Sequence, residues 1–236
     1  MSIEYLSKLP SPGEVKRQYP LDESSAAQKK IFDEQLSGIF DGSLDRFVLI
    51  IGPCSADSEA PVMAYVEKLA RIREQVQDLI RIVPRVYTNK PRTTGEGYKG
   101  MLYSPDPTNR PNLGKGVVAI RRLHLNIIKT FGFGTADEIL YPDHVRYLND
   151  LLSYAAVGAR SVENQQHRLV ASGISVPVGM KNPTGGDLSV MMNAIYAAQH
   201  AHIFSERDWE VRSSGNPHAH AILRGYVDRF GKALPN

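Results

Sequence analysis

The loop formed by residues 90–100 combines the residue types that bind phosphate groups. It reads KPRTTGEGYKG, with Lys90, Arg92 and Lys99 as cations and Glu96 as its one acid. Arginine offers a planar fork to a phosphate, lysine offers a compact charge, and glycine lets backbone N–H groups approach closely. The pattern predicts a phosphate site, and the simpler alternative is a solvated loop whose cations face water.

Further charged residues follow the ends of the predicted strands. They are Arg85, Glu138, Arg160, Lys181 and Arg224. In parallel α/β folds the carboxyl ends of the strands form the rim where ligands bind. Unpaired charge is costly to bury, and Glu138 is the clearest acid in this set. We therefore expect the phosphates and carboxylates of a substrate to supply the missing negative charge.

Cys54 is the single cysteine, so no disulfide forms within the chain. It follows a Gly-Pro pair at the end of the first predicted strand. Three interpretations are open: a small buried residue, a nucleophile, or a thiolate ligand of a borderline-soft divalent metal. The nucleophile is the weakest of these, because no base lies close by in the sequence.

Strands and helices alternate along the chain from residue 47 onwards. Continuous apolar runs predict buried strands at residues 47–54, 79–87, 133–140, 155–160, 176–182 and 221–225. Apolar residues at helical spacing predict helices at residues 55–76, 114–132, 144–154, 164–173 and 188–201. This order predicts an α/β fold with a parallel sheet.

Two segments interrupt this alternation. Residues 1–46 are polar and predict an N-terminal extension with a helix near residues 24–39, whereas residues 203–215 alternate around Trp209 and predict an inserted hairpin. Residues 47–236 then form an incomplete TIM (β/α)8-type barrel, since a closed barrel needs about eight strands and only about six are visible. An open doubly wound sheet is the alternative.

The composition favours a globular protein that binds small molecules. The 236 residues are 42% hydrophobic and carry a formal net charge of +3 from mixed signs. A nucleic-acid-binding protein usually shows a concentrated basic stripe, and none is visible. No apolar stretch reaches the roughly 18 residues that a membrane span needs, and the first residues lack the apolar core of a signal peptide. We therefore expect a cytoplasmic protein without a nucleic-acid or membrane partner.

Several motifs together resemble a known family. They are IGPCS, RVYTNKPRTT, GYKG, GARSVENQQHR, PVGMKN and LRG, in this order from about residue 5 to the end of the chain. As a set they are similar to the class I 3-deoxy-D-arabino-heptulosonate 7-phosphate (DAHP) synthases. The resemblance implies a TIM barrel with an N-terminal extension and an inserted hairpin. It also implies a transferase activity: phosphoenolpyruvate and erythrose 4-phosphate give DAHP and phosphate, in the first step of the shikimate pathway of aromatic amino acid biosynthesis.

The resemblance also implies roles for individual residues. Positions matching those that hold phosphoenolpyruvate are Arg85, Lys99, Ala159, Arg160, Lys181 and Arg224, with Glu138 beside them. Positions matching the erythrose 4-phosphate loop are Lys90, Pro91, Arg92 and Thr93. Lys90 would also lie near the reacting aldehyde, which places it with Arg85, Lys181 and Glu138 among the catalytic residues. Cys54 matches a ligand of the essential divalent metal, which could be Mn, Fe, Co or Zn.

The sequence departs from the family at its C-terminal part. The other metal ligands of the family, a His, a Glu and an Asp, lie on the last two barrel strands and beyond. We therefore expect this sequence to be a fragment of a DAHP synthase that could be inactive alone.

Other interpretations of the function are open. The chain could be a non-catalytic module that binds phosphorylated metabolites, or another phosphoenolpyruvate-using synthase that acts on a different sugar phosphate. The resemblance further implies an aromatic amino acid as feedback inhibitor, bound near the hairpin and Ser175. It also implies a homo-oligomer, either a dimer or a tetramer.

Overall fold

The computed structural model describes residues 2–92, 94–106, 108–227 and 232–234. Two helices open the fold, α1 (Pro12–Gln18) and α2 (Glu23–Phe40). The Ser11 hydroxyl accepts a hydrogen bond from the backbone N–H of Glu14, and the Glu14 carboxylate accepts one from the backbone N–H of Ser11. This capping box satisfies two N–H groups at the start of α1, a helix that the sequence analysis did not predict.

Parallel strands and long helices then alternate. The parallel strands are β1 (Phe47–Ile51), β2 (Ile80–Pro84), β3 (Thr135–Glu138), β4 (Leu152–Val157), β5 (Val178–Lys181) and β8 (Ala219–Ile222). The helices are α3 (Glu59–Val76), α4 (Leu113–Phe131), α5 (Gln165–Gly173) and α6 (Leu188–Gln199). The predicted parallel α/β fold is confirmed.

The parallel strands lie beside one another in chain order. β1 pairs with β2, and β3, β4, β5 and β8 follow one another in a second sheet. An isolated parallel bridge between Arg85 and Ala136 joins the two sheets, and the backbone N–H of Val86 donates to the carbonyl of Ala136 over 2.8 Å. A doubly wound sheet reverses its strand order at a switch point. No such reversal occurs among the described strands, so the doubly wound alternative is wrong.

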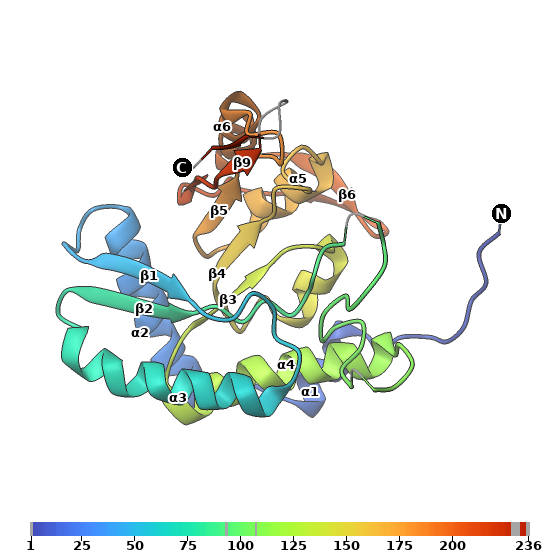
Figure 1. Ribbon diagram of the computed structural model, residues 1–236, viewed down its shortest axis with the longest axis horizontal. Helices are drawn as coiled ribbons and strands as arrows, with labels where there is room; N and C mark the ends of the chain where they lie inside the picture. The colour runs from blue at the N-terminus through green and yellow to red at the C-terminus, as the bar shows by residue number, and fades with distance from the viewer. Residues whose placement is uncertain (1, 93, 107, 228–231, 235–236) are drawn as a thin grey trace.

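The helices pack against the strands that precede and follow them. Figure 1 shows α3 and α4 side by side next to β1, β2 and β3, whereas α5 and α6 lie near β4 and β5. Helix α2 contacts β1, β4 and α4. Its residues Phe32 and Leu36 belong to the same buried cluster as Ile82 and Val83 of β2. The N-terminal helices therefore share the core of the strands.

The predicted hairpin is confirmed. Strands β6 (Ile203–Glu206) and β7 (Trp209–Arg212) pair in antiparallel fashion, and a tight turn with Arg207 at a φ of 57° joins them. A second short antiparallel pair, β9 (Tyr226–Val227) and β10 (Ala233–Leu234), follows β8. No helix among the described residues is long and apolar enough to cross a membrane.

The predicted helix at residues 144–154 is wrong. A short 3-10 helix, η1 (Pro142–Tyr147), occupies part of it, and β4 already begins at Leu152. All residues of β4 are buried, and buried residues of η1 precede them in the chain. Together, the apolar residues of the turn and the strand resemble the apolar stripe of a helix. Strand β4 also ends at Val157 rather than at residue 160, because the carbonyl of Gly158 accepts the N–H of Ser161 in a turn.

Candidate active site

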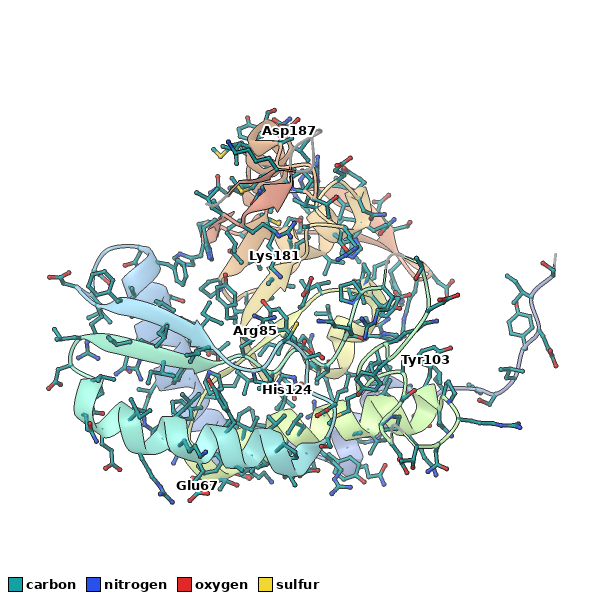
Figure 2. All side chains as sticks on the ribbon, viewed as in Figure 1. Glu67, Arg85, Tyr103, His124, Lys181 and Asp187 are labelled. Carbon is teal, nitrogen blue, oxygen red and sulfur yellow. The ribbon has the colours of Figure 1, made fainter. Side chains whose placement is uncertain are left out.

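Charged side chains meet at the carboxyl ends of the parallel strands. Cys54 follows β1, Arg85 follows β2, Glu138 ends β3 and Lys181 ends β5. Neighbouring parallel strands end at the same edge of the sheet, which brings residues far apart in sequence together. In Figure 2, Arg85 and Lys181 lie near the centre of the molecule, between the two groups of helices.

The ring of Tyr87 lies under two of these cations. The Arg85 guanidinium carbon is 4.1 Å from the ring centroid, and the Lys181 Nζ is 5.1 Å from it. Tyr87 is 4% exposed, and burial raises the pKa of its phenol. A neutral aromatic face attracts cations without neutralising them. The sequence analysis missed Tyr87, although it stands two positions after Arg85. In an extended chain, side chains two positions apart point to the same side.

Glu138 is the carboxylate partner of Lys181. Its Oε2 lies 3.3 Å from the Lys181 Nζ, and the two side chains are only 9% and 19% exposed. A Cβ atom on Gly158 would lie 2.0 Å from the Glu138 Oε1, so the glycine provides the space for this carboxylate. Burial lowers the pKa of Lys181, Glu138 opposes this effect, and the positive charges of Arg85 and Arg224 add to it.

Lys90 and Arg85 both contact Cys54, which lies shortly after β1. The Lys90 Nζ lies 2.5 Å from the Cys54 Sγ, and the Arg85 Nη2 donates to the Cys54 carbonyl over 3.1 Å. The hydrogen bond from Lys90 lowers the pKa of the Cys54 thiol, although partial burial opposes this shift. Cys54 is exposed, which excludes the interpretation of a small buried core residue.

The cationic loop is closed by its own backbone. The N–H of Lys90 donates to the carbonyl of Lys99 over 2.9 Å, and the Arg92 Nε donates to the carbonyl of Tyr98 over 2.8 Å. Gly100 has a φ of 102°, and a Cβ atom there would lie 2.4 Å from the Thr88 carbonyl oxygen. The loop therefore turns back on the segment after β2, at a position where a side chain would not fit.

The remaining predicted residues lie around this group to different degrees. Arg224 follows β8, where its N–H donates to the Asn182 side chain, and its charge is near enough to affect Lys181. The Lys99 ammonium contacts the ring of Tyr103 at 4.7 Å, and Tyr103 lies apart from Arg85 and Lys181 in Figure 2.

Three further predicted residues lie in the turn after β4 and beside Lys90. Ala159 is half-buried and Arg160 is exposed in the turn after β4, and Pro91 is half-buried beside Lys90. Thr93 lies outside the described residues.

The described residues do not complete a metal site. Cys54 offers one soft ligand, but no group of three His, Cys, Asp or Glu side chains comes together as metal ligands in the described part of the chain. The described partner of the Cys54 sulfur is the Lys90 ammonium.

The arrangement suits a small, multiply charged anion. Arg85, Lys90 and Lys181 approach one another with one carboxylate, Glu138, among them. Like charges that gather in a partly buried site repel unless an anion joins them. Guanidinium and ammonium groups on the rim of a parallel sheet bind the phosphates and carboxylates of metabolites.

Two curated proteins are similar to this chain over most of its length. The "Phospho-2-dehydro-3-deoxyheptonate aldolase, Phe-sensitive" of Escherichia coli (strain K12) is 37% identical over 230 residues, which are 95% of this chain and 65% of that protein. The Tyr-sensitive protein of the same strain is 36% identical over 222 residues, 92% of this chain and 62% of that protein. The chain thus spans a little under two thirds of the length of these curated relatives.

A solved structure shares the fold. The phospho-2-dehydro-3-deoxyheptonate aldolase of Francisella tularensis SCHU S4 superposes with a TM-score of 0.90 at 32% identity, over 95% of this chain and 67% of that one. The family profile described as "DAHP synthetase I family" matches residues 19–232. The resemblance inferred from the motifs is confirmed, and the chain belongs to the DAHP synthetase I family.

Proposed function

We propose that this chain acts as a DAHP synthase, condensing phosphoenolpyruvate with erythrose 4-phosphate to give DAHP and phosphate. The observation that carries the proposal is the pair of cations over Tyr87, Arg85 and Lys181, with Glu138 bound to Lys181. The proposal also includes a TIM (β/α)8-type barrel as the architecture, with residues 1–46 as an N-terminal extension and residues 47–236 as an incomplete barrel of about six strands. Phosphorylated substrates of this kind are cytoplasmic metabolites, which suits a cytoplasmic enzyme.

Phosphoenolpyruvate would bind at the centre of the mouth, which is the rim formed by the carboxyl ends of the parallel strands. Arg85 and Lys181 would hold its carboxylate and phosphate, and Lys99, Ala159, Arg160 and Arg224 would line the rest of its site. Fixed cations stabilise charge that stays on the substrate throughout the reaction, and they need no reorganisation at the transition state. Tyr87 supports this role, because its neutral ring keeps both cations in place and leaves their charge to the substrate.

Erythrose 4-phosphate would bind at the cationic loop. Residues Lys90, Pro91, Arg92 and Thr93 would form its site, with Arg92 on the phosphate and Lys90 close to the aldehyde oxygen. C3 of phosphoenolpyruvate attacks the aldehyde carbon, and Lys90 donates a hydrogen bond to the oxygen that gains negative charge. The new carbon–carbon bond leaves positive character at C2. Water then adds at C2, and phosphate leaves from the same carbon.

Cys54 remains a proposed metal ligand. Its exposed sulfur and its lowered pKa favour the thiolate that binds metal. Cys54 would hold a divalent metal as one ligand among several, and a metal bound there would polarise the aldehyde oxygen.

Turnover and binding together test the proposal. Phosphate release and loss of phosphoenolpyruvate should require both substrates and should be measured with manganese added. Arg85→Ala should abolish binding of phosphoenolpyruvate in calorimetry. Arg71→Ala is the matched control, because Arg71 lies on the exposed face of α3 in an ion pair with Glu67. A wild-type chain that binds neither substrate would refute the proposal.

The incomplete metal set favours one second candidate. A module that binds phosphorylated metabolites without turnover needs the cations but no metal. Binding of phosphoenolpyruvate without phosphate release, under the same conditions, would support it. An assay with arabinose 5-phosphate in place of erythrose 4-phosphate separates both from a synthase for another sugar phosphate.

We also propose that an aromatic amino acid binds beside the hairpin. The relatives are named Phe-, Trp- and Tyr-sensitive, and this chain has a pocket of about 190 Å³ between α5, η1 and β6. Apolar residues line it, among them Leu169, Ile174 and Phe204, and Ser175 lies at its wall. Arg146 and Glu206 approach to 3.5 Å and offer charges for an amino acid backbone. Thermal shifts with each aromatic amino acid, lost in Phe204→Ala, would support this site.

An assembly of several chains completes the proposal. The N-terminal arm extends away from the body in Figure 1, and it carries the exposed side chains of Ile3, Tyr5 and Leu6. Exposed apolar residues in a row are typical of segments that bind another chain. Light scattering should give the mass of a dimer or a tetramer, and deletion of residues 1–9 should lower it.

A further inference from the structure

A buried carboxylate stands next to Glu138 and has no part in the proposed reaction. Asp137 is a residue of β3, is 4% exposed, and contacts His124 of α4. Because side chains alternate along a strand, Asp137 faces the opposite side from Glu138. A buried carboxylate destabilises the fold unless hydrogen-bond donors surround it, so its donors indicate what it holds in place.

The donors to Asp137 come from two segments of the site. Its Oδ1 accepts the backbone N–H of Thr88 over 2.9 Å and the N–H of Glu138 over 2.7 Å. Its Oδ2 accepts the hydroxyl of Thr88 over 2.5 Å. One carboxylate therefore binds the backbone at Glu138 and the beginning of the segment that leads to Lys90.

The hydrogen bond from Thr88 to the Asp137 side chain takes the place of a backbone hydrogen bond between two strands. The N–H of Val86 donates to the backbone carbonyl of Ala136, as in a regular parallel ladder. Two residues further on, the N–H of Thr88 donates to the side chain of Asp137. The Thr88 carbonyl accepts the N–H of Leu102 over 3.2 Å, so Thr88 fixes both ends of the loop that carries the cations.

Helix α4 also contacts the Asp137 carboxylate. His124 of α4 is fully buried, and its Nε2 lies 3.4 Å from the Asp137 Oδ2. Its Nδ1 lies 2.7 Å from the Thr135 hydroxyl oxygen. A neutral imidazole with its proton on Nε2 donates to Asp137 and accepts from Thr135, which satisfies all three groups. Figure 2 shows His124 between α4 and the strands.

We propose that Asp137 is a positioning residue that sets the cationic loop against Glu138, and that it acts mainly on the sugar-phosphate side of the mouth. This role rests on the proposed function. Lys90 stands two residues after Thr88, whereas Arg85 and Lys181 stand at strand ends that do not depend on the loop. Loss of the carboxylate would release Lys90 and Arg92 and leave those two cations over Tyr87.

Hydrogen exchange tests the positioning without any substrate. In Asp137→Ala, the amides of residues 88–102 should exchange at least about tenfold faster than in the wild type, since the Thr88 N–H loses its acceptor. Asp137→Asn should stay close to the wild type, because an amide oxygen can accept the same two N–H groups. Asp78→Ala, at an exposed acid after α3, is the control. Wild-type exchange in Asp137→Ala would overturn the proposal.

Calorimetry tests which substrate depends on the loop. Asp137→Ala should weaken erythrose 4-phosphate binding about tenfold and phosphoenolpyruvate binding by no more than about threefold, because Lys99 is the one proposed phosphoenolpyruvate residue in the loop, and Asp137→Asn should restore both. An equal loss for both substrates would show a general structural role and overturn the proposal.

Two further measures keep the test decisive. If the wild type binds neither substrate, the proposed function fails, and the exchange of residues 88–102 still decides on the positioning. If Asp137→Ala does not fold, Thr88→Val carries the same test, because it removes only the hydroxyl donor. It should raise the exchange of the loop to an intermediate level, and an unchanged loop would again contradict the proposal.

Discussion

Removing the carboxylate of Glu138 should destabilise the protein through Lys181. Glu138→Gln keeps the size of the side chain but leaves the Lys181 ammonium, 3.3 Å away, without its ionic partner. At an effective dielectric constant of about 20, two unit charges at this distance attract by about 5 kcal/mol, and desolvation offsets part of that. Breaking a fully buried pair costs about 3–5 kcal/mol, and because Lys181 keeps 19% of its surface exposed, we expect a loss of about 2–3 kcal/mol near pH 7.

The pH dependence of this loss identifies its cause. Burial already lowers the pKa of Lys181 and Glu138 opposes the shift, so the substitution lowers this pKa further. The unfolded lysine binds a proton up to about pH 10.4, whereas the folded one releases it earlier. Between these two pKa values the unfolded state holds more protons, so stability rises with pH. The deficit of Glu138→Gln should therefore be largest near pH 7 and should shrink as the pH approaches about 10.

Urea unfolding of four proteins measures the effect. They are the wild type, Glu138→Gln, Lys181→Met and the double variant, each at neutral and at alkaline pH. In the Lys181→Met background the Gln substitution should cost nothing or should stabilise, because a lone buried carboxylate is then removed. A loss that is the same at both pH values, or that persists without Lys181, would refute the attribution to this ion pair.

Three glycine positions give further predictions. Gly158→Ala should displace the carboxylate of Glu138, since its Cβ would lie 2.0 Å from the Oε1, and should weaken phosphoenolpyruvate binding in calorimetry without unfolding the chain. Gly116→Ala in α4 should cost about 2–4 kcal/mol in urea unfolding, because its Cβ would lie 1.7 Å from the Leu102 carbonyl oxygen. Gly114→Ala, two residues earlier in α4, meets only an ordinary contact and should be neutral or stabilising by up to about 1 kcal/mol.

The order of the strands and the charged rim at their carboxyl ends could be predicted from the sequence, because a parallel sheet imposes both. Apolar runs such as that of β1 have no polar face, so their charged residues are expected at the ends. The prediction that β1 is buried on both faces is wrong, because Phe47 is 78% and Leu49 40% exposed. Arg85, Glu138 and Lys181 were predicted on this ground, and the structure brings them together. Their roles with substrates remain predictions.

Helix α1 and the segment before β4 could not be predicted in the same way. The capping box of α1 rests on Ser11 and Glu14, a local signal that stands in a segment without an apolar stripe. The apolar residues before β4 serve a turn and then a fully buried strand, and their spacing imitates a helix. Periodicity indicates which residues are buried, but at such a junction it does not distinguish the elements that bury them.

The contacts of Asp137 and Tyr87 depend on neighbours that are distant in the chain. A carboxylate in a buried strand signals a partner, yet its donors come from α4 and from the loop after β2. Tyr87 becomes a platform only when Lys181 of β5 arrives above its ring. Sequence reasoning finds the charged residues at the rim, whereas the neutral and buried groups that hold them become visible only when the strands are assembled.

These supporting contacts explain how cations can stand together before a substrate binds. Arg85 rests on the face of Tyr87 and donates to a backbone carbonyl, and Lys90 faces a thiol whose pKa it lowers. Each partner fixes the position of a cation, and in the described part of the chain Glu138 brings a full negative charge to Lys181. An anion that enters the mouth therefore meets groups whose orientation is already set, and it relieves their mutual repulsion as it binds. Since the orientation does not have to be gained on binding, the free energy of the ionic contacts is available to hold the substrates in the geometry that the proposed condensation requires.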